Sequence, residues 1–388
     1  MKKGYMEYVS AILAAVYFLC LMPNAGIQST GLFSYGKKAA LIGFAGLAFL
    51  KIINAIKETE GNTIFEKCYV FLKSHVFLFL SLVFCAVIEV LTKQLMPLKA
   101  FFIILALADT DFDFQCKAIL GGKVLMMILV LYGYMKTFVP GGIVAEEGQL
   151  LQFTLGFANP AVLMAELLGI LWLFLYLYRE SFTISEFLIL NCLNVLGYAL
   201  TGCTGMMILF LLCSFGVYLW QKVPFTTSGS WVFIVIVLAV ILVPVMFAVL
   251  YHDTNPLLYK WNLLMDNRLL MQNQLITEQG IGLIGHNCWE LAYFPVEEVW
   301  LDQSFIRDLI EYGIVFVSMM TVWISLSVRH LCKKNNAAGI LITIGFLCTS
   351  VLFYQTMSEN IHLALLMISI IVLKTDKELF TGDGYDGL

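Results

Sequence analysis

The chain has 388 residues, of which 60% are hydrophobic and only 13% are charged. A soluble domain carries about 25% charged residues and roughly half apolar ones, so a soluble fold of this length could not bury so many apolar side chains. The net charge of -4 also argues against nucleic acid as a main partner, because phosphate binding needs a basic field. The composition therefore predicts an integral membrane protein.

Twelve apolar segments approach the length that a transmembrane helix needs. A bilayer core about 30 Å thick requires roughly 20 apolar residues in one helix. The segments are residues 5–22, 38–56, 74–92, 95–109, 118–139, 157–178, 184–201, 203–220, 231–250, 304–328, 337–357 and 360–374. Because lipid offers the backbone no hydrogen-bond partner, we expect all of them to be helices. The predicted fold class is an all-α polytopic transmembrane bundle of about twelve spans, with residues 1–388 as a single membrane domain.

The first span follows Met1-Lys2-Lys3 and resembles a signal peptide, but the many spans after it favour a retained helix. With the N-terminus inside, most Lys and Arg residues of the connections fall on the cytoplasmic side. The segment from Arg329 to Lys334 marks the inner end of the tenth span best. Positive residues accumulate in cytoplasmic loops, so the sequence predicts that both termini are cytoplasmic.

Two external connections stand out by length. One covers residues 140–155, and the other, residues 251–303, precedes the tenth span. A long polar loop on a compact bundle is more often functional than not, so we expect the working surface of the protein to face outward. The interior of the second loop, residues 263–277, is predicted to form a helix on the membrane surface.

The long loop and its flanks carry the densest set of polar groups. Arg268 and His286 lie in the loop, and Asp302 lies just before the tenth span. Arg307 and Glu311 lie within that span at a spacing of four residues, so they share one helix face. One interpretation is an ion pair that hides both charges from lipid. The other is an arginine that Glu311 holds so that its planar fork faces a phosphate.

Two other positions could supply a base. His286 is either a polar surface residue or a proton acceptor for a sugar hydroxyl, because histidine exchanges protons near neutral pH. Glu359 and His362 follow Ser358 at the start of the last span and share a face. This pattern fits either an interfacial helix cap or a carboxylate that faces an acceptor.

Polar groups elsewhere favour plainer explanations. Within the spans, Glu166, Asn191 and Asn194 are predicted to make hydrogen bonds between helices. The carboxylates of residues 109–113 are expected in a solvated cytoplasmic loop. The sequence contains no Walker A loop, no HExxH motif and no close cluster of metal ligands, so we expect neither a metal nor another cofactor.

Short motifs in the second half of the chain suggest a family. The motifs are Thr154-Leu155-Gly156-Phe157-Ala158-Asn159-Pro160, Thr201-Gly202-Cys203-Thr204-Gly205, Ile281-Gly282-Leu283-Ile284-Gly285, Leu301-Asp302-Gln303-Ser304-Phe305 and Tyr312-Gly313-Ile314. In this order, around a long external loop, they resemble the Wzy-like O-antigen and capsular polysaccharide polymerases of bacteria. The resemblance covers roughly residues 100–374.

The resemblance implies a GT-C-like membrane glycosyltransferase that joins repeat units carried on undecaprenyl pyrophosphate at the outer face of the plasma membrane. It implies that Arg268 and Arg307 bind the pyrophosphate. Family members often carry an arginine where this chain has Gln152, and we expect Lys136 to supply that charge. In the family, the short connection between the seventh and eighth spans often contains Arg or Ser, and this chain has Cys203 there.

The expected reaction inverts the sugar carbon without a metal, with His286 or Glu359 as base and Asp302 as a second carboxylate. The expected partners are the lipid-linked oligosaccharide, membrane lipid, a flippase and a chain-length regulator. Two rival functions remain open. A ligase of the same superfamily would transfer finished glycan to a terminal acceptor. A transporter or flippase of lipid-linked oligosaccharide would need mid-membrane charges around a cavity, and broken helices.

Overall fold

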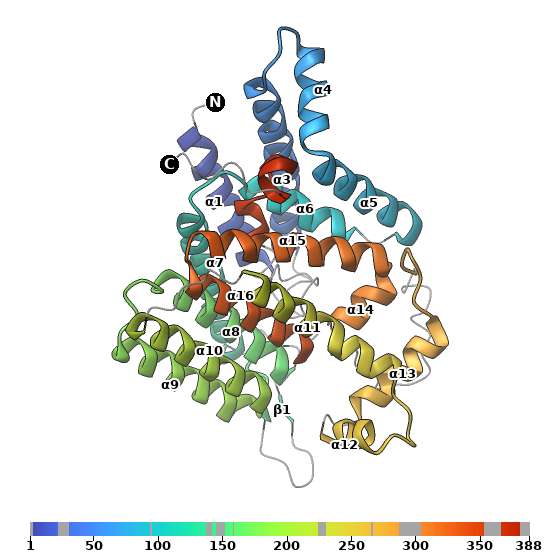
Figure 1. Cartoon of the computed structure of the whole chain (residues 1–388). Coiled ribbons are helices and arrows are strands. Elements are labelled where there is room, and N and C mark those ends of the chain that lie inside the picture. Colours follow the sequence, from blue (N-terminus) through green and yellow to red (C-terminus); the bar gives the residue numbers. More distant parts are fainter. Residues whose placement is uncertain are drawn as a thin grey trace.

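The computed structural model describes residues 3–21, 31–93, 95–136, 142–144, 152–157, 159–223, 230–264, 267–286, 304–352 and 366–380. These residues form a helical bundle with one small hairpin (Figure 1). The helices are α1 (Lys3–Cys20), α3 (Gly31–Glu58), α4 (Ile64–Ser74), α5 (Val76–Thr92), α6 (Met96–Leu107), α7 (Phe112–Met135), α8 (Pro160–Leu177), α9 (Ile184–Thr201), α10 (Thr204–Lys222), α11 (Ser230–Val249), α12 (Pro256–Leu264), α13 (Arg268–Gln279), α14 (Ser304–Glu311), α15 (Gly313–Lys333), α16 (Ala337–Leu352), the 3-10 helix η1 (Met367–Ile370) and α18 (Asp376–Phe380). Strands β1 (Ile143–Val144) and β2 (Gln152–Phe153) pair in antiparallel fashion.

The helices confirm the class of protein but not the number of spans. Among the described residues, seven helices are long and apolar enough to cross a membrane, or eight if the bent pair α4–α5 counts as one span. The predicted fourth span corresponds to α6, whose twelve residues reach only about 18 Å. Eight of those twelve residues are buried, so burial within the protein explains their apolar character.

Two other predicted spans differ from the structure in their described parts, although α15 remains a candidate span. The tenth, residues 304–328, is broken into α14 and α15, because Gly313 adopts a φ of +85° between them. Of the twelfth, residues 367–374 form η1 and turns instead of an α-helix. Buried Met367, Ile368 and Val372 pack there within the main core. Turn residues that are buried in the core are as apolar as residues of a lipid-facing helix, so the sequence pattern did not distinguish them.

Local signals explain where the central helices begin and end. Asn159 starts α8, because its Oδ1 accepts the backbone N–H of Val162 at 2.8 Å and Pro160 occupies the first turn. Thr183 and Glu186 form a capping box at the start of α9. Gly202 ends α9 with a φ of +72°, a conformation that glycine adopts without strain.

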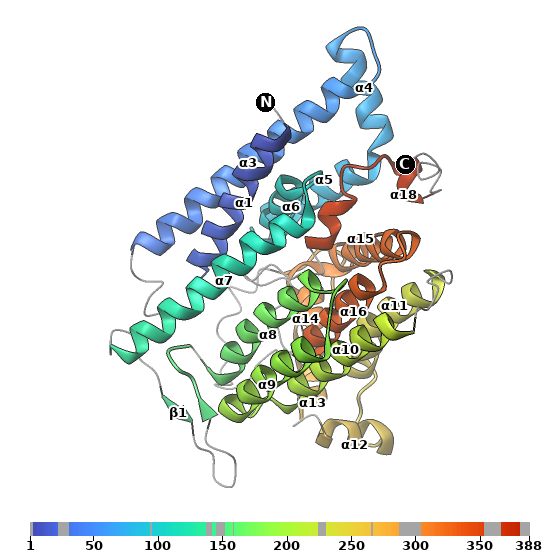
Figure 2. The ribbon, with the colours of Figure 1, turned by 90° about the vertical axis from the view of Figure 1, so that its left-hand side faces the viewer.

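The helices pack in an order that gives the bundle two distinct ends. Helix α1 packs on α3 and α7, so the first apolar segment belongs to the bundle, and α8, α9 and α10 follow as successive neighbours (Figures 1 and 2). Helix α15 packs on α11 and is tied to α5 by a hydrogen bond of 3.0 Å from Trp323 Nε1 to Ser81 Oγ.

We call one end of the bundle the terminal end. It contains the start of α1 and α7, the ends of α8, α10 and α15, and α18. The backbone N–H of Asp111 donates to Glu7 Oε1 at 2.9 Å, and Arg329 Nη1 donates to the carbonyl of Phe380 at 2.8 Å. Both ends of the described chain therefore lie at this end of the bundle. Which side of the membrane this is stays a prediction.

We call the opposite end the loop end. It contains the β1–β2 hairpin, the α9–α10 turn, α12, α13, α14 and the start of α15, and it lies toward the lower right in Figure 1. The predicted helix over residues 263–277 corresponds mostly to α13, whereas residues 263 and 264 end α12, and Asn267 before α13 has a φ of +63°. The long loop is therefore built largely of helices over its described residues, which end at residue 286.

Candidate functional site

The Arg307–Glu311 pair is the centre of the candidate site at the loop end. Both residues lie on α14, and Arg307 Nε lies 2.6 Å from Glu311 Oε1. The Arg307 side chain is 34% exposed, whereas that of Glu311 is 10% exposed. A carboxylate that binds Nε fixes the plane of the guanidinium through a charge-assisted hydrogen bond. The predicted ion pair is thus present, and it leaves the arginine within reach of a ligand.

The segment from Gly282 to His286 packs against the break between α14 and α15. The backbone N–H of His286 donates to the carbonyl of Ile310 at 2.9 Å. In return, the N–H of Ile314 donates to the carbonyl of Gly282 at 3.0 Å, and that of Val315 to Leu283 at 3.2 Å. These bonds satisfy donors of the first turn of α15, which have no partner inside the helix.

Two glycines permit this close backbone contact. A Cβ at Gly285 would overlap the carbonyl of Glu311, and a Cβ at Gly313 would lie 2.5 Å from the carbonyl oxygen of Leu283. Two motifs that suggested the family, the glycine-rich segment and Tyr312-Gly313-Ile314, therefore meet in space. Their glycines have a packing role that any residue with a side chain would disrupt.

This contact brings His286 to the helix that carries Arg307. The His286 backbone is attached to Ile310, which is one turn after Arg307 and directly before Glu311, and its side chain is exposed. A base and a phosphate-binding cation could therefore act on one substrate at this surface. The other two predicted catalytic residues, Asp302 and Glu359, lie outside the described residues, as does His362.

Arg268 lies on the neighbouring helix. It is the first residue of α13, which packs on α14 through a small apolar cluster containing Leu269, Leu275, Ile306 and Ile310. Arg268 directly precedes Leu269, and Arg307 directly follows Ile306, so each arginine is adjacent in sequence to a residue of this cluster. The structure therefore places both predicted pyrophosphate-binding arginines on helices that touch.

Lys136 occupies a different part of the loop end. It caps α7, and its Nζ lies 6.0 Å from the centre of the Tyr132 ring. The end of α7 and α14 lie apart in Figure 2. The structure therefore does not group Lys136 with the two arginines.

A second contact at the loop end joins the hairpin to the α9–α10 turn. A Cβ at Gly202 would lie 3.0 Å from Nε2 of Gln152, so the Gln152 side chain covers this turn. The backbone N–H of Thr154 donates to the carbonyl of Gly142 at 3.1 Å and closes the hairpin. Gln152, which stands where the family often has arginine, thus lies against a second family-like motif.

The predicted hydrogen bonds between helices are present. Asn191 Nδ2 donates to Ser214 Oγ at 3.0 Å, and Asn194 Nδ2 donates to the carbonyl of Met207 at 2.9 Å, both between α9 and α10.

Glu166 of α8 also accepts an interhelical hydrogen bond, from Lys123 Nζ of α7 to Oε2 at 2.8 Å, and the two form an ion pair. Both residues are buried, and Lys123 Nζ also lies 5.4 Å from the centre of the Phe18 ring of α1. Sequence reasoning missed Lys123, although a lysine in the middle of an apolar segment is a signal in itself.

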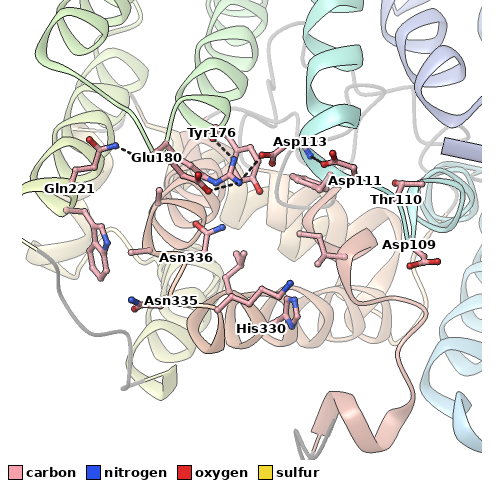
Figure 3. A pocket seen from close by; sticks show the side chains of 18 of the residues that line it. Asp109, Thr110, Asp111, Asp113, Tyr176, Glu180, Gln221, His330, Asn335 and Asn336 are labelled. Atoms are coloured by element: carbon pink, nitrogen blue, oxygen red, sulfur yellow. Dashed lines mark hydrogen bonds and ion pairs between the residues drawn. The ribbon is translucent and has the colours of Figure 1, made fainter. Parts of the chain in front are cut away.

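The terminal end contains a hollow of about 1030 Å³ between α7, α8, α10 and the α15–α16 connection (Figure 3). Arg179 stands at one wall, where its Nη2 lies 3.0 Å from Asp113 Oδ2 and its guanidinium lies 4.2 Å from the centre of the Tyr176 ring. Gln221 Nε2 donates to the carbonyl of Arg179 at 2.6 Å. Residues 109–113 are therefore not merely a solvated loop, since Asp113 ties α7 to α8.

The charges around this hollow are mainly negative. Its lining includes the carboxylates of Glu7, Asp109, Asp111, Asp113 and Glu180 and the cations of Arg179 and Lys334. Such a lining disfavours a phosphate group. Among the described residues, no group of three or more His, Cys, Asp or Glu side chains is arranged to hold a metal ion.

No protein-family model matches this chain, and no curated protein sequence matches it. The apolar helices define a multi-pass helical membrane protein.

Proposed function

We propose that this chain polymerises lipid-linked oligosaccharide repeat units into a surface or capsular polysaccharide. The proposed location is the outer face of a bacterial plasma membrane, with both termini cytoplasmic. The observation that carries the proposal is the partly exposed Arg307, which Glu311 holds beside the glycine-anchored His286. The ordered motifs around this site, which resemble those of Wzy-like polymerases, support the same function.

The proposed reaction transfers the growing glycan from undecaprenyl pyrophosphate to a hydroxyl of an incoming lipid-linked unit. A bond forms between the acceptor oxygen and the sugar carbon, and the bond from that carbon to the pyrophosphate breaks, with inversion. A base takes the proton of the acceptor hydroxyl, and cations stabilise the departing pyrophosphate. We assign the base to His286 or Glu359, a supporting carboxylate to Asp302, and the cations to Arg307 and Arg268.

The distribution of charge supports the loop end as the phosphate-binding side. Arg307 and Arg268 lie there on adjacent helices, whereas the terminal hollow is lined mainly by carboxylates. In the proposed pathway, a flippase supplies the lipid-linked units to the outer face and a chain-length regulator limits the polymer.

The test compares polymer length in cells that make equal amounts of each variant. We expect Arg307→Ala and Arg268→Ala to shorten the gel ladder of repeat units, because each removes a cation from the leaving group. Arg307→Lys keeps the charge but loses the planar fork, so it should restore the ladder only in part. Lys260→Ala is the matched control, since it removes an exposed cation from nearby α12. Long polymer in both arginine variants would contradict the proposal.

The ligase alternative is separated by the same gel. A polymerase defect leaves single repeat units on the acceptor, whereas a ligase defect leaves long polymer on the lipid carrier.

The transporter alternative has two observations in its favour. One is the buried Lys123–Glu166 pair, and the other is the 84° bend between α4 and α5. If the chain is a flippase, Glu166→Gln at normal protein level should trap lipid-linked units on the cytoplasmic face. If it is a polymerase, single units should still reach the outer face.

A further inference from the structure

Helix α12 exposes four large apolar side chains although it is too short to cross a membrane. Leu257, Tyr259, Trp261 and Leu263 are between 44% and 61% exposed, on a helix of only nine residues. Leu257 and Trp261 share one face of the helix, and Tyr259 and Leu263 share another, so apolar groups lie on two sides of it. Exposed apolar groups of this kind mark a surface that another apolar medium covers.

The next helix, α13, is the natural comparison. Its exposed side carries Gln274, Thr277 and Glu278, while Leu269 and Leu275 are buried. Two consecutive helices at the same end of the bundle thus present opposite surfaces. The contrast indicates that α12 contacts an apolar medium and that α13 faces water.

Contacts with α11 set the height of α12 and α13 along the bundle. The ring centre of Trp261 of α12 lies 6.4 Å from that of Phe247, and Asn273 Nδ2 of α13 donates to the carbonyl of Ala248 at 2.9 Å. Helix α11 ends at Val249, and each residue adds about 1.5 Å, so both contacts lie within a few ångströms of its end. Helix α12 therefore sits at the level where the α11 span ends.

Asn262 keeps α12 and α13 together as one unit. Its Oδ1 accepts the backbone N–H of Leu270 at 3.0 Å, and its Nδ2 donates to Asn267 Oδ1 at 3.0 Å. Asn262 is buried despite being polar. The pair of helices is therefore attached to the end of α11 in a defined position.

We propose that α12 is an interfacial helix and that its partner is the phospholipid bilayer itself. Trp and Tyr concentrate at the lipid–water boundary, where an apolar ring meets lipid and a polar tip meets water. Exposed apolar side chains also occur at the end of α11 and just after it, at Met246, Val249 and Leu250. Lys260 is exposed on the same helix, and a lysine at such a boundary can lay its apolar stem along lipid with its charge at the headgroups. The proposal depends on α11 crossing the membrane and is independent of glycosyl transfer.

A photocrosslinking experiment on the full chain in its native membrane tests this directly. Trp261 is replaced by p-benzoylphenylalanine in one sample, and Glu278 of α13 in the matched control. We expect irradiation to attach phospholipid at position 261 and not at position 278, as read by the mass of the protein. Equal lipid attachment at both positions, or a crosslink from position 261 to protein, would overturn the proposal.

A second measurement uses a conservative variant that preserves folding. The fluorescence of Trp261→Phe is subtracted from that of the original chain, both in phospholipid vesicles, so the difference reports Trp261 alone. Lipids brominated near the headgroup should quench this difference more than lipids brominated near the chain end. Quenching by aqueous iodide but by neither lipid would show that α12 lies in water and would refute the interfacial position.

Discussion

At the loop end, Arg307 binds Glu311 and stays 34% exposed, whereas at the terminal end Arg179 is 11% exposed and lies near two carboxylates and a tyrosine ring. The Arg307–Glu311 ion pair lies within one helix, so it orients a side chain. The partners of Arg179 include Asp113 of α7 and Gln221 of α10, so its contacts join three helices. The comparison teaches that the Glu311 contact leaves part of the Arg307 side chain accessible, whereas the contacts of Arg179 hold helices together.

The largest loss of stability is expected from Gly285→Ala, which would break the arrangement at the loop end. The new methyl group would overlap the carbonyl of Glu311, so the Gly282–His286 segment must move away from the α14–α15 break. We expect a loss of about 3 kcal/mol in the free energy of unfolding, measured by SDS titration in mixed micelles. Gly142→Ala is the control, because open space surrounds that position. Equal stability of the two variants would contradict the described packing.

Arg179→Ala should have the next largest effect on stability. It removes the charge that lies between Asp113 and Glu180 and leaves partly buried hydrogen-bond partners unsatisfied. The expected loss is about 2 kcal/mol. Polymer length per amount of folded protein should stay unchanged. Glu180→Ala, which removes an 87% exposed side chain, is expected to change little. A shortened polymer at normal protein level would show that the terminal end takes part in the reaction.

Asn159→Ala tests whether a family-like motif at the loop end has a structural role. The substitution removes the side-chain oxygen that caps α8, and such a loss costs about 1 kcal/mol. Asn159→Asp should restore most of the stability, because aspartate caps helices equally well. Thermal unfolding in detergent measures both variants. A variant that is fully stable yet makes short polymer would show that Asn159 acts on substrate instead.

Arg307→Ala should have the smallest effect on stability and the clearest effect on the product. A partly exposed ion pair within one helix contributes about 0.5 kcal/mol, so the unfolding curve should hardly move. The proposed polymer should nevertheless shorten. An Arg307→Ala variant that unfolds early and makes normal polymer would reverse the roles assigned to Arg307 and Arg179.

Much of the helical framework could be predicted from the apolar pattern. The seventh predicted span, residues 184–201, coincides with α9, because Thr183 and Gly202 mark its two ends. The break at Gly313 could not be predicted in the same way. Glycine is common inside membrane helices, and only the carbonyls of Gly282 and Leu283 make the broken form favourable here. The short α6 was misjudged because buried and lipid-facing side chains have the same composition.

The candidate site shows the same division between near and distant neighbours. The Arg307–Glu311 pair was predictable because residues four apart share a face of any helix. The Lys123–Glu166 and Arg179–Asp113 pairs join residues 43 and 66 positions apart, and no local pattern connects them. No local pattern predicts the contact between His286 and Ile310 either, because it depends on the close backbone approach that Gly285 and Gly313 permit.

By itself, the sequence determined that this is a helical membrane protein, because a backbone in lipid must satisfy its hydrogen bonds within each segment. It also determined which charges share a helix face. Only the tertiary structure decided which helices are short enough to be internal, where the tenth span breaks, and which charges pair across the bundle. Those outcomes depend on contacts between segments far apart in the chain, and such contacts leave no periodic trace in the sequence.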